Sequence, residues 1–372
     1  MASYNQQQKK IWDHQTPWQL LRNKSSKTPE GRHWHTGNIC KGVDNTLHYI
    51  IFGGYSTNAQ TGHSDVWSMA LDTNTWSMIK HKNISSVRST ARYSHTAVIL
   101  HDTLSPDPPG TCNLYIFGGT IRSETTLKQT DEKKLYHVKF IDSRTNPWPK
   151  DLPNWTMYIQ EIKNYAPFTS ERASHSAVKL NHRMYIFGGV SGFANGVAVH
   201  NDFWSYSIRT KQWRDEHGKP IQGLVPTGRF NHRAVLYRAS SSSRDMYKNT
   251  VHMIIFGGQG LNSYTFSMHD DLWSVMLIGN DGKEVETIKW KQLLQAKGSI
   301  KRTDGVMIIW NSYIVYFGGM ELTSSASFVY RDIFRTDVQN LIEADLDAKF
   351  ERSPKECKQY PRKNYKVKCI GK

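Results

Sequence analysis

Tyr49-Ile50-Ile51-Phe52-Gly53-Gly54 is an apolar strand that ends in a glycine pair, and the chain repeats this pattern four more times. The other copies are Tyr115-Ile116-Phe117-Gly118-Gly119, Tyr185-Ile186-Phe187-Gly188-Gly189, Ile254-Ile255-Phe256-Gly257-Gly258 and Val315-Tyr316-Phe317-Gly318-Gly319. Aromatic and β-branched residues favour strands, and paired glycines allow positive φ or close backbone approach. Five copies in phase predict a repeat architecture.

Two further patterns recur in the same phase. An arginine opens the segments Arg92-Tyr93-Ser94-His95-Thr96-Ala97, Arg172-Ala173-Ser174-His175-Ser176-Ala177 and Arg229-Phe230-Asn231-His232-Arg233-Ala234, with Arg32-His33-Trp34-His35 in the same slot and Arg302-Thr303-Asp304-Gly305 as an irregular fifth copy. After the glycine pairs come Asp65-Val66-Trp67, Asp202-Phe203-Trp204, Asp271-Leu272-Trp273 and Asp332-Ile333-Phe334, and a second tryptophan follows at Trp76, Trp213 and Trp290. We therefore expect four short strands per unit, called a, b, c and d in chain order.

These residues resemble the kelch repeat, whose blade has a glycine pair after its second strand, an aromatic residue in its third and a tryptophan in its fourth. The resemblance covers roughly residues 16–338 and implies an all-β, kelch-type β-propeller of four-stranded blades around a central channel. The fifth unit lacks strand d, and Trp18-Gln19-Leu20-Leu21 mirrors the fourth strand of unit four, Trp290-Lys291-Gln292-Leu293-Leu294. We expect five blades, with the N-terminal strand closing the ring. A sixth blade of unrecognisable sequence is the alternative.

Composition fits one large propeller domain at 16–338, between an N-terminal extension at 1–15 and a C-terminal region at 339–372. No stretch approaches the ~20 apolar residues of a membrane span, and the N-terminus lacks the apolar core of a signal peptide. The four cysteines, Cys40, Cys112, Cys357 and Cys369, form no Cys-x-x-Cys pair. Isolated thiols fit a reducing compartment, so we expect a cytoplasmic or nuclear protein that is not secreted.

The net charge is +16, and basic residues are dense at the C-terminus. Apolar residues between Gln339 and Phe350 predict a short amphipathic helix, and a basic tail follows. The tail could bind an anionic surface or nucleic acid through Lys355, Lys358, Arg362, Lys363, Lys366 and Lys368. The alternative is a solvated appendage.

Function is expected in the connections of the propeller. The b–c connections, 55–64, 120–134, 190–201, 259–270 and 320–331, are rich in Gly, Ser, Asn and Thr and are predicted to be flexible recognition loops. They share one face with the d–a connections.

In similar kelch propellers, the junction arginines and the residues just after the glycine pair line the ligand pocket. The resemblance thus implies a partner-binding set of Arg32, Arg92, Arg172, Arg229, Arg302, Tyr55, Thr120, Val190, Gln259 and Met320. Five guanidinium groups suit a carboxylate or an acidic peptide. Alternatively, each arginine only ties down its own turn.

The repeated histidines, His95, His175, His232 and His35, are interpreted as one structural hydrogen bond in each blade, because they are spread around the axis and metal ligands must converge on one ion. We find no match to the copper or iron sites of kelch-type enzymes, and no phosphate loop or nucleophile elbow. The sequence therefore predicts a non-catalytic propeller without cofactor, acting as a protein-interaction scaffold or recognition subunit of a larger complex. The alternatives are a nucleic-acid-associated subunit and a cryptic metal-dependent enzyme.

Overall fold

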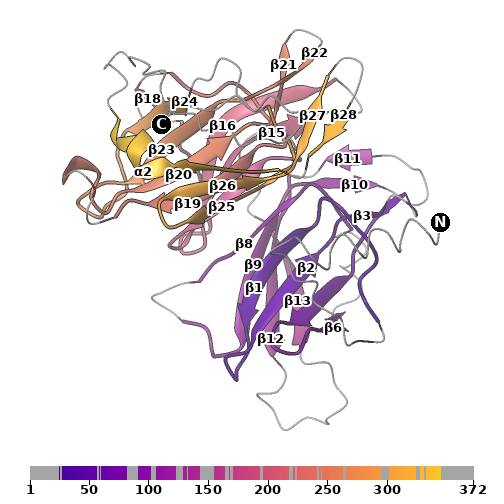
Figure 1. Cartoon of the computed structure of the whole chain (residues 1–372). Coiled ribbons are helices and arrows are strands. Elements are labelled where there is room, and N and C mark those ends of the chain that lie inside the picture. The colour runs from indigo at the N-terminus through magenta and orange to yellow at the C-terminus, as the bar shows by residue number, and fades with distance from the viewer. Residues whose placement is uncertain are drawn as a thin grey trace, which may run out of the picture.

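Five antiparallel sheets follow one another along the chain in the computed structural model (Figure 1). It describes residues 25, 27–56, 58, 60–81, 91–101, 106–122, 129–131, 133–142, 155–163, 167, 171–192, 196–217, 221–222, 224–240, 243, 245–262, 265–294, 301–323, 327–330 and 332–344. Each sheet contains one glycine-pair strand as its second strand, which confirms the five-bladed kelch-type arrangement.

The strands of each blade lie side by side in chain order. Blade 1 consists of β1 (Thr36–Lys41), β2 (Leu47–Phe52), β5 (Val66–Ala70) and β6 (Thr75–Met78). Blade 2 consists of β8 (Thr96–Ile99), β9 (Thr111–Phe117), β12 (Leu135–Asp142) and β13 (Trp155–Ile162). Blade 3 consists of β14 (Ser176–Leu180), β15 (Arg183–Ser191), β16 (Ala198–Ser207) and β17 (Gln212–Asp215). Blade 4 consists of β19 (Arg233–Arg238), β20 (Val251–Phe256), β23 (Leu272–Ile278) and β24 (Ile288–Leu294). Blade 5 has three described strands, β25 (Val306–Trp310), β26 (Tyr313–Phe317) and β29 (Ile333–Asp337).

The glycine pairs form the corners at which one blade meets the next. Gly53 and Gly54 have φ of 65° and 105°, in the left-handed region. The N–H of Gly54 donates to the carbonyl of Arg92 in blade 2 at 2.9 Å, and a Cβ on Gly53 would lie 2.5 Å from that oxygen. The same bond joins Gly119 to Arg172, Gly189 to Arg229 and Gly258 to Arg302. Glycine is therefore required twice, for the turn and for the close approach.

The repeated histidines join neighbouring blades. The hydroxyl of Thr36 in blade 1 hydrogen-bonds to Nε2 of His95 in blade 2 at 2.9 Å. Thr96 contacts His175 at 2.7 Å, and Ser176 contacts His232 at 2.7 Å. These three histidines therefore make structural hydrogen bonds, as expected, and each ring reaches back to the first residue of strand a in the preceding blade.

Blade 5 meets blade 4 through different residues, since Gly305 stands in the histidine slot. Arg233 fills the gap: its guanidinium donates to the carbonyl of Gly305 and lies 3.6 Å from the carboxylate of Asp304. A side chain at position 305 would collide with the ring of Tyr316. The irregular fifth copy thus has an arginine–aspartate contact where the others have a histidine–hydroxyl bond.

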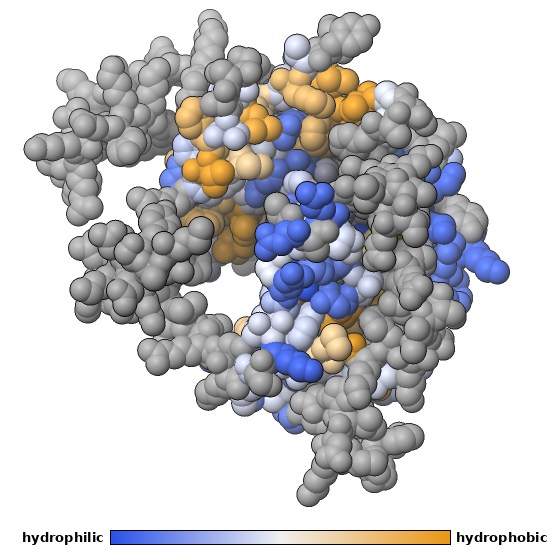
Figure 2. Space-filling model, turned by 90° about the vertical axis from the view of Figure 1, so that its right-hand side faces the viewer, coloured by the Kyte–Doolittle hydropathy of each residue, from blue (hydrophilic) through white to orange (hydrophobic). Residues whose placement is uncertain are grey.

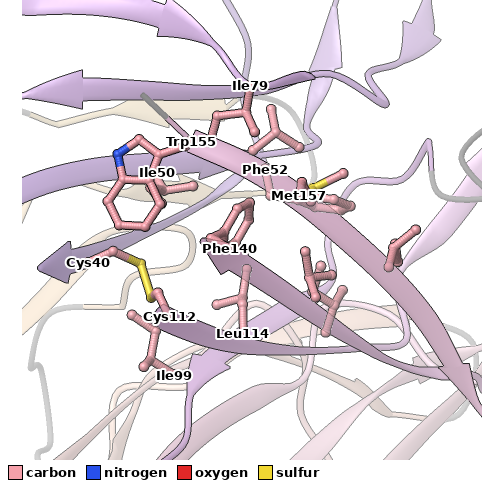
Figure 3. Packing of buried hydrophobic residues seen from close by; sticks show 14 of the residues in the cluster. Cys40, Ile50, Phe52, Ile79, Ile99, Cys112, Leu114, Phe140, Trp155 and Met157 are labelled. Carbon is pink, nitrogen blue, oxygen red and sulfur yellow. A yellow bond between two sulfur atoms is a disulfide. The ribbon is translucent and has the colours of Figure 1, made fainter. Parts of the chain in front are cut away.

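Four buried hydrophobic clusters fill the four seams between consecutive blades. Figure 3 shows the cluster between blades 1 and 2, where Ile50 and Phe52 face Leu114 and Phe140. Buried clusters of this size supply most of the stabilisation of such a fold, at about 25 cal/mol per Å² of apolar surface removed from water. Each seam is therefore an extended apolar interface beneath the polar corner bonds.

Cys40 and Cys112 are linked by a disulfide across the first seam (Figure 3). Both are 2% exposed. The expectation of isolated thiols was wrong for this pair, because β1 and β9 lie next to each other across the seam although 72 residues separate the cysteines in sequence. Cys357 and Cys369 lie outside the described residues.

The flanks of blades 5 and 1 that would form a fifth seam are exposed among the described residues. In blade 5, Val306, Ile308 and Trp310 are 58%, 52% and 57% exposed, and in blade 1 Ile39 is 48% exposed. Phe317 is 38% exposed, whereas its equivalents Phe52, Phe117 and Phe187 are at most 1% exposed. The indole of Trp34 lies near enough to Asp304 across this seam to oppose the rise that burial causes in the pKa of that carboxyl. The Trp18 strand that is predicted to close the ring lies outside the described residues.

The linkers before blades 2 and 4 indicate where the Trp18 strand would lie. After β6 and β17 the chain forms β7 (Lys80–His81) and β18 (Ile221–Gln222), which pair in parallel with the d strands of the following blades, β13 and β24. Ser25 has the matching place in blade 1, since its hydroxyl accepts the N–H of Trp76 in β6 and donates to the Trp76 carbonyl. By analogy, the residues just before Ser25 should be strand d of the preceding blade.

A short helix, α2 (Val338–Glu343), follows blade 5 and begins one residue before the predicted Gln339–Phe350 segment. Asp337 caps it by accepting the N–H of Asn340. Val338 and Ile342 are buried against blades 4 and 5. Residues 345–372, with the basic tail, lie outside the described residues. No helix in the described part of the chain is long and apolar enough to cross a bilayer.

We expect deletion of residues 1–24 to destabilise the propeller, because β29 would lose its predicted fourth-strand partner. Replacement of Trp18 by Ala should lower the free energy of unfolding by about 3 kcal/mol, as for other buried aromatic residues. Gln19→Ala is the matched control, since its side chain should point to the opposite face. The readout is thermal and urea unfolding, and an unchanged stability in both Trp18→Ala and the deletion would contradict closure by this strand.

Candidate functional site

The b–c connections continue as two-stranded ribbons beyond the glycine corners. The ribbons are β3 (Tyr55–Ser56) with β4 (Thr61–Gly62), β10 (Thr120–Arg122) with β11 (Gln129–Asp131), β21 (Gln259–Asn262) with β22 (Thr265–Met268), and β27 (Met320–Leu322) with β28 (Ser327–Val329). In blade 3, β15 and β16 themselves continue past a register shift between Phe187 and Gly189. The described parts of these connections are therefore two-stranded ladders rather than irregular loops.

The residues after the glycine pairs pair with the residues after the junction arginines. The pairs are His33 with Tyr55, Tyr93 with Thr120, Ala173 with Val190, Phe230 with Gln259, and Thr303 with Met320. The structure thus brings the b–c ribbons and the d–a turns together on one face, which we call the ribbon face. Thr120, Val190 and Gln259 are at most 6% exposed, so their side chains pack inside the blades.

The junction arginines are bound within their own blades. Arg172 forms two hydrogen bonds of 2.6 Å with Asp202 and donates to the carbonyl of Gly188 at 3.0 Å. Arg32 pairs with Asp65 and Gly53, Arg229 with Asp271 and Gly257, and Arg302 with Asp332. These four side chains are at most 6% exposed. They tie down their own turns, which is one of the two roles that the sequence left open, and ligand binding by them stays a prediction.

Two junctions depart from this pattern. In blade 2, Lys134 precedes Leu135 where the other blades have aspartate, and Arg92 lies over the ring of Tyr136 at 4.5 Å and donates to the carbonyl of Gly118. In blade 5, Arg302 stacks on Tyr330 at 3.4 Å and lies 3.6 Å from Glu321. Stacking of the guanidinium on an aromatic ring therefore replaces the arginine–aspartate pair in blade 2 and supplements it in blade 5.

Asp65, Asp202 and Asp271 are ionised at neutral pH. Burial opposes the charge of Asp202, but hydrogen bonds and charge from Arg172 outweigh burial and hold the pKa of the carboxyl below its usual value. The same balance lowers the pKa of Asp65 and Asp271. Each of these three arginine–aspartate pairs is neutral as a whole, so Arg32, Arg172 and Arg229 do not present free guanidinium groups on the ribbon face.

Exposed apolar side chains lie on the ribbons of blades 4 and 5. Phe266 in β22 is 55% exposed, and Phe328 and Val329 in β28 are 50% and 80% exposed. Figure 2 shows apolar residues in the upper part of the molecule, at the height of these ribbons in Figure 1, above a band of polar residues. Large exposed apolar residues in one region are typical of contact surfaces.

A group of aromatic residues, of which only Trp34 is exposed, lies where the turn of blade 1 meets that of blade 2. Trp34 is 40% exposed and stacks on Tyr93 with ring centroids 5.7 Å apart. Tyr55 contacts both rings, and His33 packs edge-on against Trp34 at 4.3 Å. We call Trp34, Tyr55, Tyr93 and His33 the aromatic cluster. Sequence reasoning included only Tyr55 of this group.

Among the described residues, no group of three or more His, Cys, Asp or Glu side chains is arranged to hold a metal ion. The six basic tail residues proposed to bind anions lie beyond Ala344, outside the described residues.

Comparison with known proteins assigns the repeat. The model of the KLHDC2/KLHL20/DRC7 Kelch-repeats domain matches residues 37–242, more than half of the chain. The chain belongs to this kelch-repeat family. Kelch domain-containing protein 3 of Homo sapiens is 27% identical over 167 residues, and Kelch domain-containing protein 10 of Bos taurus is 26% identical over 163 residues. Each alignment covers 44% of this chain but only 36% and 30% of those relatives.

The fold has a counterpart among solved structures. The "Structure of YjhT" superposes with a TM-score of 0.50 and 16% identity, covering 79% of this chain and 74% of that chain. At this identity the likeness concerns the fold alone.

The seam histidines should make stability depend on pH. Burial lowers the pKa of His175 to about 3 and those of His95 and His232 well below 6.5, with neighbouring arginines adding to the effect. The unfolded chain therefore binds protons below pH 6.5 that the folded chain does not, so stability falls as pH falls from 6.5 towards 3. We expect the melting temperature to drop between pH 7 and pH 5. His175→Gln should flatten this decline, and an equally steep decline in the variant would contradict the assignment.

Arg172 and Asp202 should be energetically coupled. Arg172→Ala should lower the free energy of unfolding by about 3 kcal/mol, because it leaves a partly buried carboxylate and the carbonyl of Gly188 without their donor. A double-mutant cycle with Asp202→Ala should give a coupling energy of about 1–3 kcal/mol by urea unfolding. Additive effects of the two substitutions would show that the pair does not anchor the turn.

Proposed function

We propose that this kelch propeller is a non-catalytic protein-interaction module that contacts its partner through the ribbon face. The observation that carries the proposal is the exposure of Phe266, Phe328 and Val329 on ribbons that stand clear of the buried seams. Aromatic residues in such positions dominate the affinity of many interfaces. The kelch-repeat family of the chain agrees with a scaffold or recognition subunit of a larger complex.

The arrangement of the face supports this role. The ribbons begin at rigid glycine corners and are fixed by arginine–aspartate pairs and backbone bridges. Side chains on such ribbons are held in place before binding, which lowers the entropy that association costs. Because the guanidinium groups are already paired, we place the contact on the apolar and aromatic side chains above them. A partner with an acidic segment or free carboxylate stays a prediction from sequence.

The nucleic-acid-associated alternative depends on Lys355, Lys358, Arg362, Lys363, Lys366 and Lys368, and no described residue favours it. The cytoplasmic or nuclear location is likewise a proposal. The Cys40–Cys112 bond weakens its basis, because disulfides are uncommon in reducing compartments.

The test is affinity purification of the full chain and of the variant Phe266→Ser/Phe328→Ser/Val329→Ser, with quantification of co-purifying proteins. We expect at least one specific partner to be lost from the variant by tenfold or more. The matched control is Met78→Ser/Met246→Ser, which removes side chains that are 53% and 64% exposed on β6 and in the a–b connection of blade 4. The control should retain the partner. Both variants should melt like the parent, since exposed substitutions rarely change stability by more than about 0.5 kcal/mol.

Loss of the partner from the Met78/Met246 variant, with retention by the ribbon variant, would move the interface to another surface.

A further inference from the structure

One face of the blade 5 sheet is apolar and exposed. Residues that pair across antiparallel strands point to the same face, so the register of β25, β26 and β29 assigns the members of this face. We call it the blade 5 flank, and its large apolar members are Val306, Ile308, Trp310, Phe317 and Ile333. These side chains are between 38% and 58% exposed. Contiguous apolar residues with this exposure are typical of a contact surface.

The equivalent face of blade 4 shows how such residues look when they are covered. Leu272 stands where blade 5 has Ile333, and Tyr237 stands where blade 5 has Trp310. Both residues of blade 4 are 2% exposed, because blade 5 packs on them. The blade 5 flank therefore has the side chains of a seam without the layer that covers a seam.

Blade 1 does not supply that layer through its described residues. A Cβ on Gly53, Gly188 or Gly257 would meet the carbonyl of the next junction arginine, whereas a Cβ on Gly318 would meet the carbonyl of Tyr330, within its own blade. The corner of blade 5 thus lacks the close approach that brings the other blades together. The facing side of blade 1 is exposed as well, which indicates room for a further layer between the two blades.

The N-terminal segment leaves blade 1 at a place from which it can supply this layer. Ser25 is bonded to Trp76 in β6, the last strand of blade 1. The Trp18 strand before it is predicted to lie beside β29 as the fourth strand of blade 5. Pro17 precedes that strand directly, and proline is typical of turns and of the first position of a strand. Residues ahead of Pro17 can therefore turn back onto the blade 5 flank.

The length of the segment permits this path. An extended chain covers ~3.3 Å per residue, so the stretch from Trp18 back to Trp12 can span about 20 Å. Neighbouring strands lie about 4.8 Å apart, which puts the first strand of a blade about 14 Å from the fourth. Residues 11–13 can thus reach every strand of blade 5.

The chemistry of residues 11–13 matches that of the flank. Ile11 and Trp12 are adjacent apolar residues in an otherwise polar stretch between residues 5 and 15, and Asp13 is the only acidic residue of segment 1–24. On the flank, Arg335 occupies the same row as Ile308, is exposed, and lies over the ring of Tyr313 at 5.2 Å. An apolar pair followed by a carboxylate therefore complements an apolar face that carries one guanidinium group.

We propose that residues 11–13 bind the blade 5 flank and fill the fifth seam, with Ile11 and Trp12 on its apolar side chains and Asp13 paired with Arg335. The inference goes beyond the proposed function, because it concerns a surface other than the ribbon face. It rests on the prediction that the Trp18 strand is strand d of blade 5. The C-terminal tail fits this flank less well, because its strongly basic residues would repel Arg335.

The test replaces Ile308 in the full chain by the photoreactive residue p-benzoylphenylalanine. Irradiation of the dilute protein should link position 308 to residues 9–15 of the same chain. Mass spectrometry of a mixture of isotopically labelled and unlabelled protein distinguishes this link from a link between two copies. The matched control carries the same photoreactive residue at Phe266, which is 55% exposed on the ribbon face, and it should give no link to residues 9–15. The absence of a link from position 308 to residues 9–15, or links only to blade 1, to residues 345–372 or to a second copy, would overturn the proposal.

A charge reversal tests the Asp13–Arg335 pair itself. Asp13→Arg and Arg335→Asp should each shift the balance between the docked and the released segment by about two- to fivefold, seen as a weaker cross-link, and the double variant should restore it. His14→Arg adds the same charge, but alternate residues of an extended segment point to opposite faces. Arg335→Asp should therefore not rescue His14→Arg. Rescue of both variants, or of neither, would contradict the pair.

Deletion of residues 1–14 separates this inference from closure by the Trp18 strand, which the deletion keeps. We expect the deletion to increase the labelling of Trp310 by hydroxyl radicals and to leave the labelling of Phe266 unchanged. If only the deletion of residues 1–24 increases the labelling of Trp310, the Trp18 strand stands and the role of residues 11–13 fails. If neither deletion changes it, both the closure and the present inference fail.

Discussion

The hydrogen bond from the second glycine of each of the first four pairs to the carbonyl of the next junction arginine is the contact on which the other features of the propeller depend. It fixes the end of strand b against the following blade, and it is possible only because the corner has positive φ and no Cβ. The bond from Gly189 to the carbonyl of Arg229 fixes the d–a turn of blade 4 against the end of strand b in blade 3. It thereby also fixes the direction of the ribbon that continues beyond the corner. The apolar seams then pack below a corner that is already defined.

The local repeats explain why the blades could be predicted from sequence while their contacts could not. Each glycine-pair strand carries its own signal, and five copies in phase left little freedom in the strand order. The structural role of the histidines was predicted, but a linear sequence does not say whether His95 faces Thr96 or Thr36. The ribbons were taken for loops because Gly, Ser, Asn and Thr are frequent in both, and only the bridge to the preceding turn selects the ladder. The Cys40–Cys112 pair likewise depends on contact across a seam.

The sequence predicted where the candidate site lies better than it predicted which side chains are exposed there. The glycine-pair and arginine positions do meet on one face, as the resemblance implied, but their side chains are mostly buried. A signal for this was present in the sequence, since an aspartate precedes the aromatic residue of strand c in every blade that has the bidentate arginine. A buried guanidinium needs a carboxylate partner to offset its desolvation, so in-phase Arg and Asp should be interpreted first as anchors. No such periodic signal marks Phe266, Phe328 or Trp34, because the exposed residues of a repeat protein differ from blade to blade.

This division between repeated and unique residues has a consequence for recognition. A ring of identical blades would present the same chemistry in five directions and could not orient a partner. Here the buried arginine–aspartate pairs, glycine corners and seam histidines repeat, whereas the exposed groups break the symmetry: the indole of Trp34 in blade 1, and apolar ribbons in blades 4 and 5. Asp304, in the irregular turn of blade 5, lies near enough to Trp34 of blade 1 for the indole to influence the pKa of its carboxyl. The asymmetry is therefore greatest at the junction of the first and last blades, where the chemistry of the ribbon face changes most within the shortest distance.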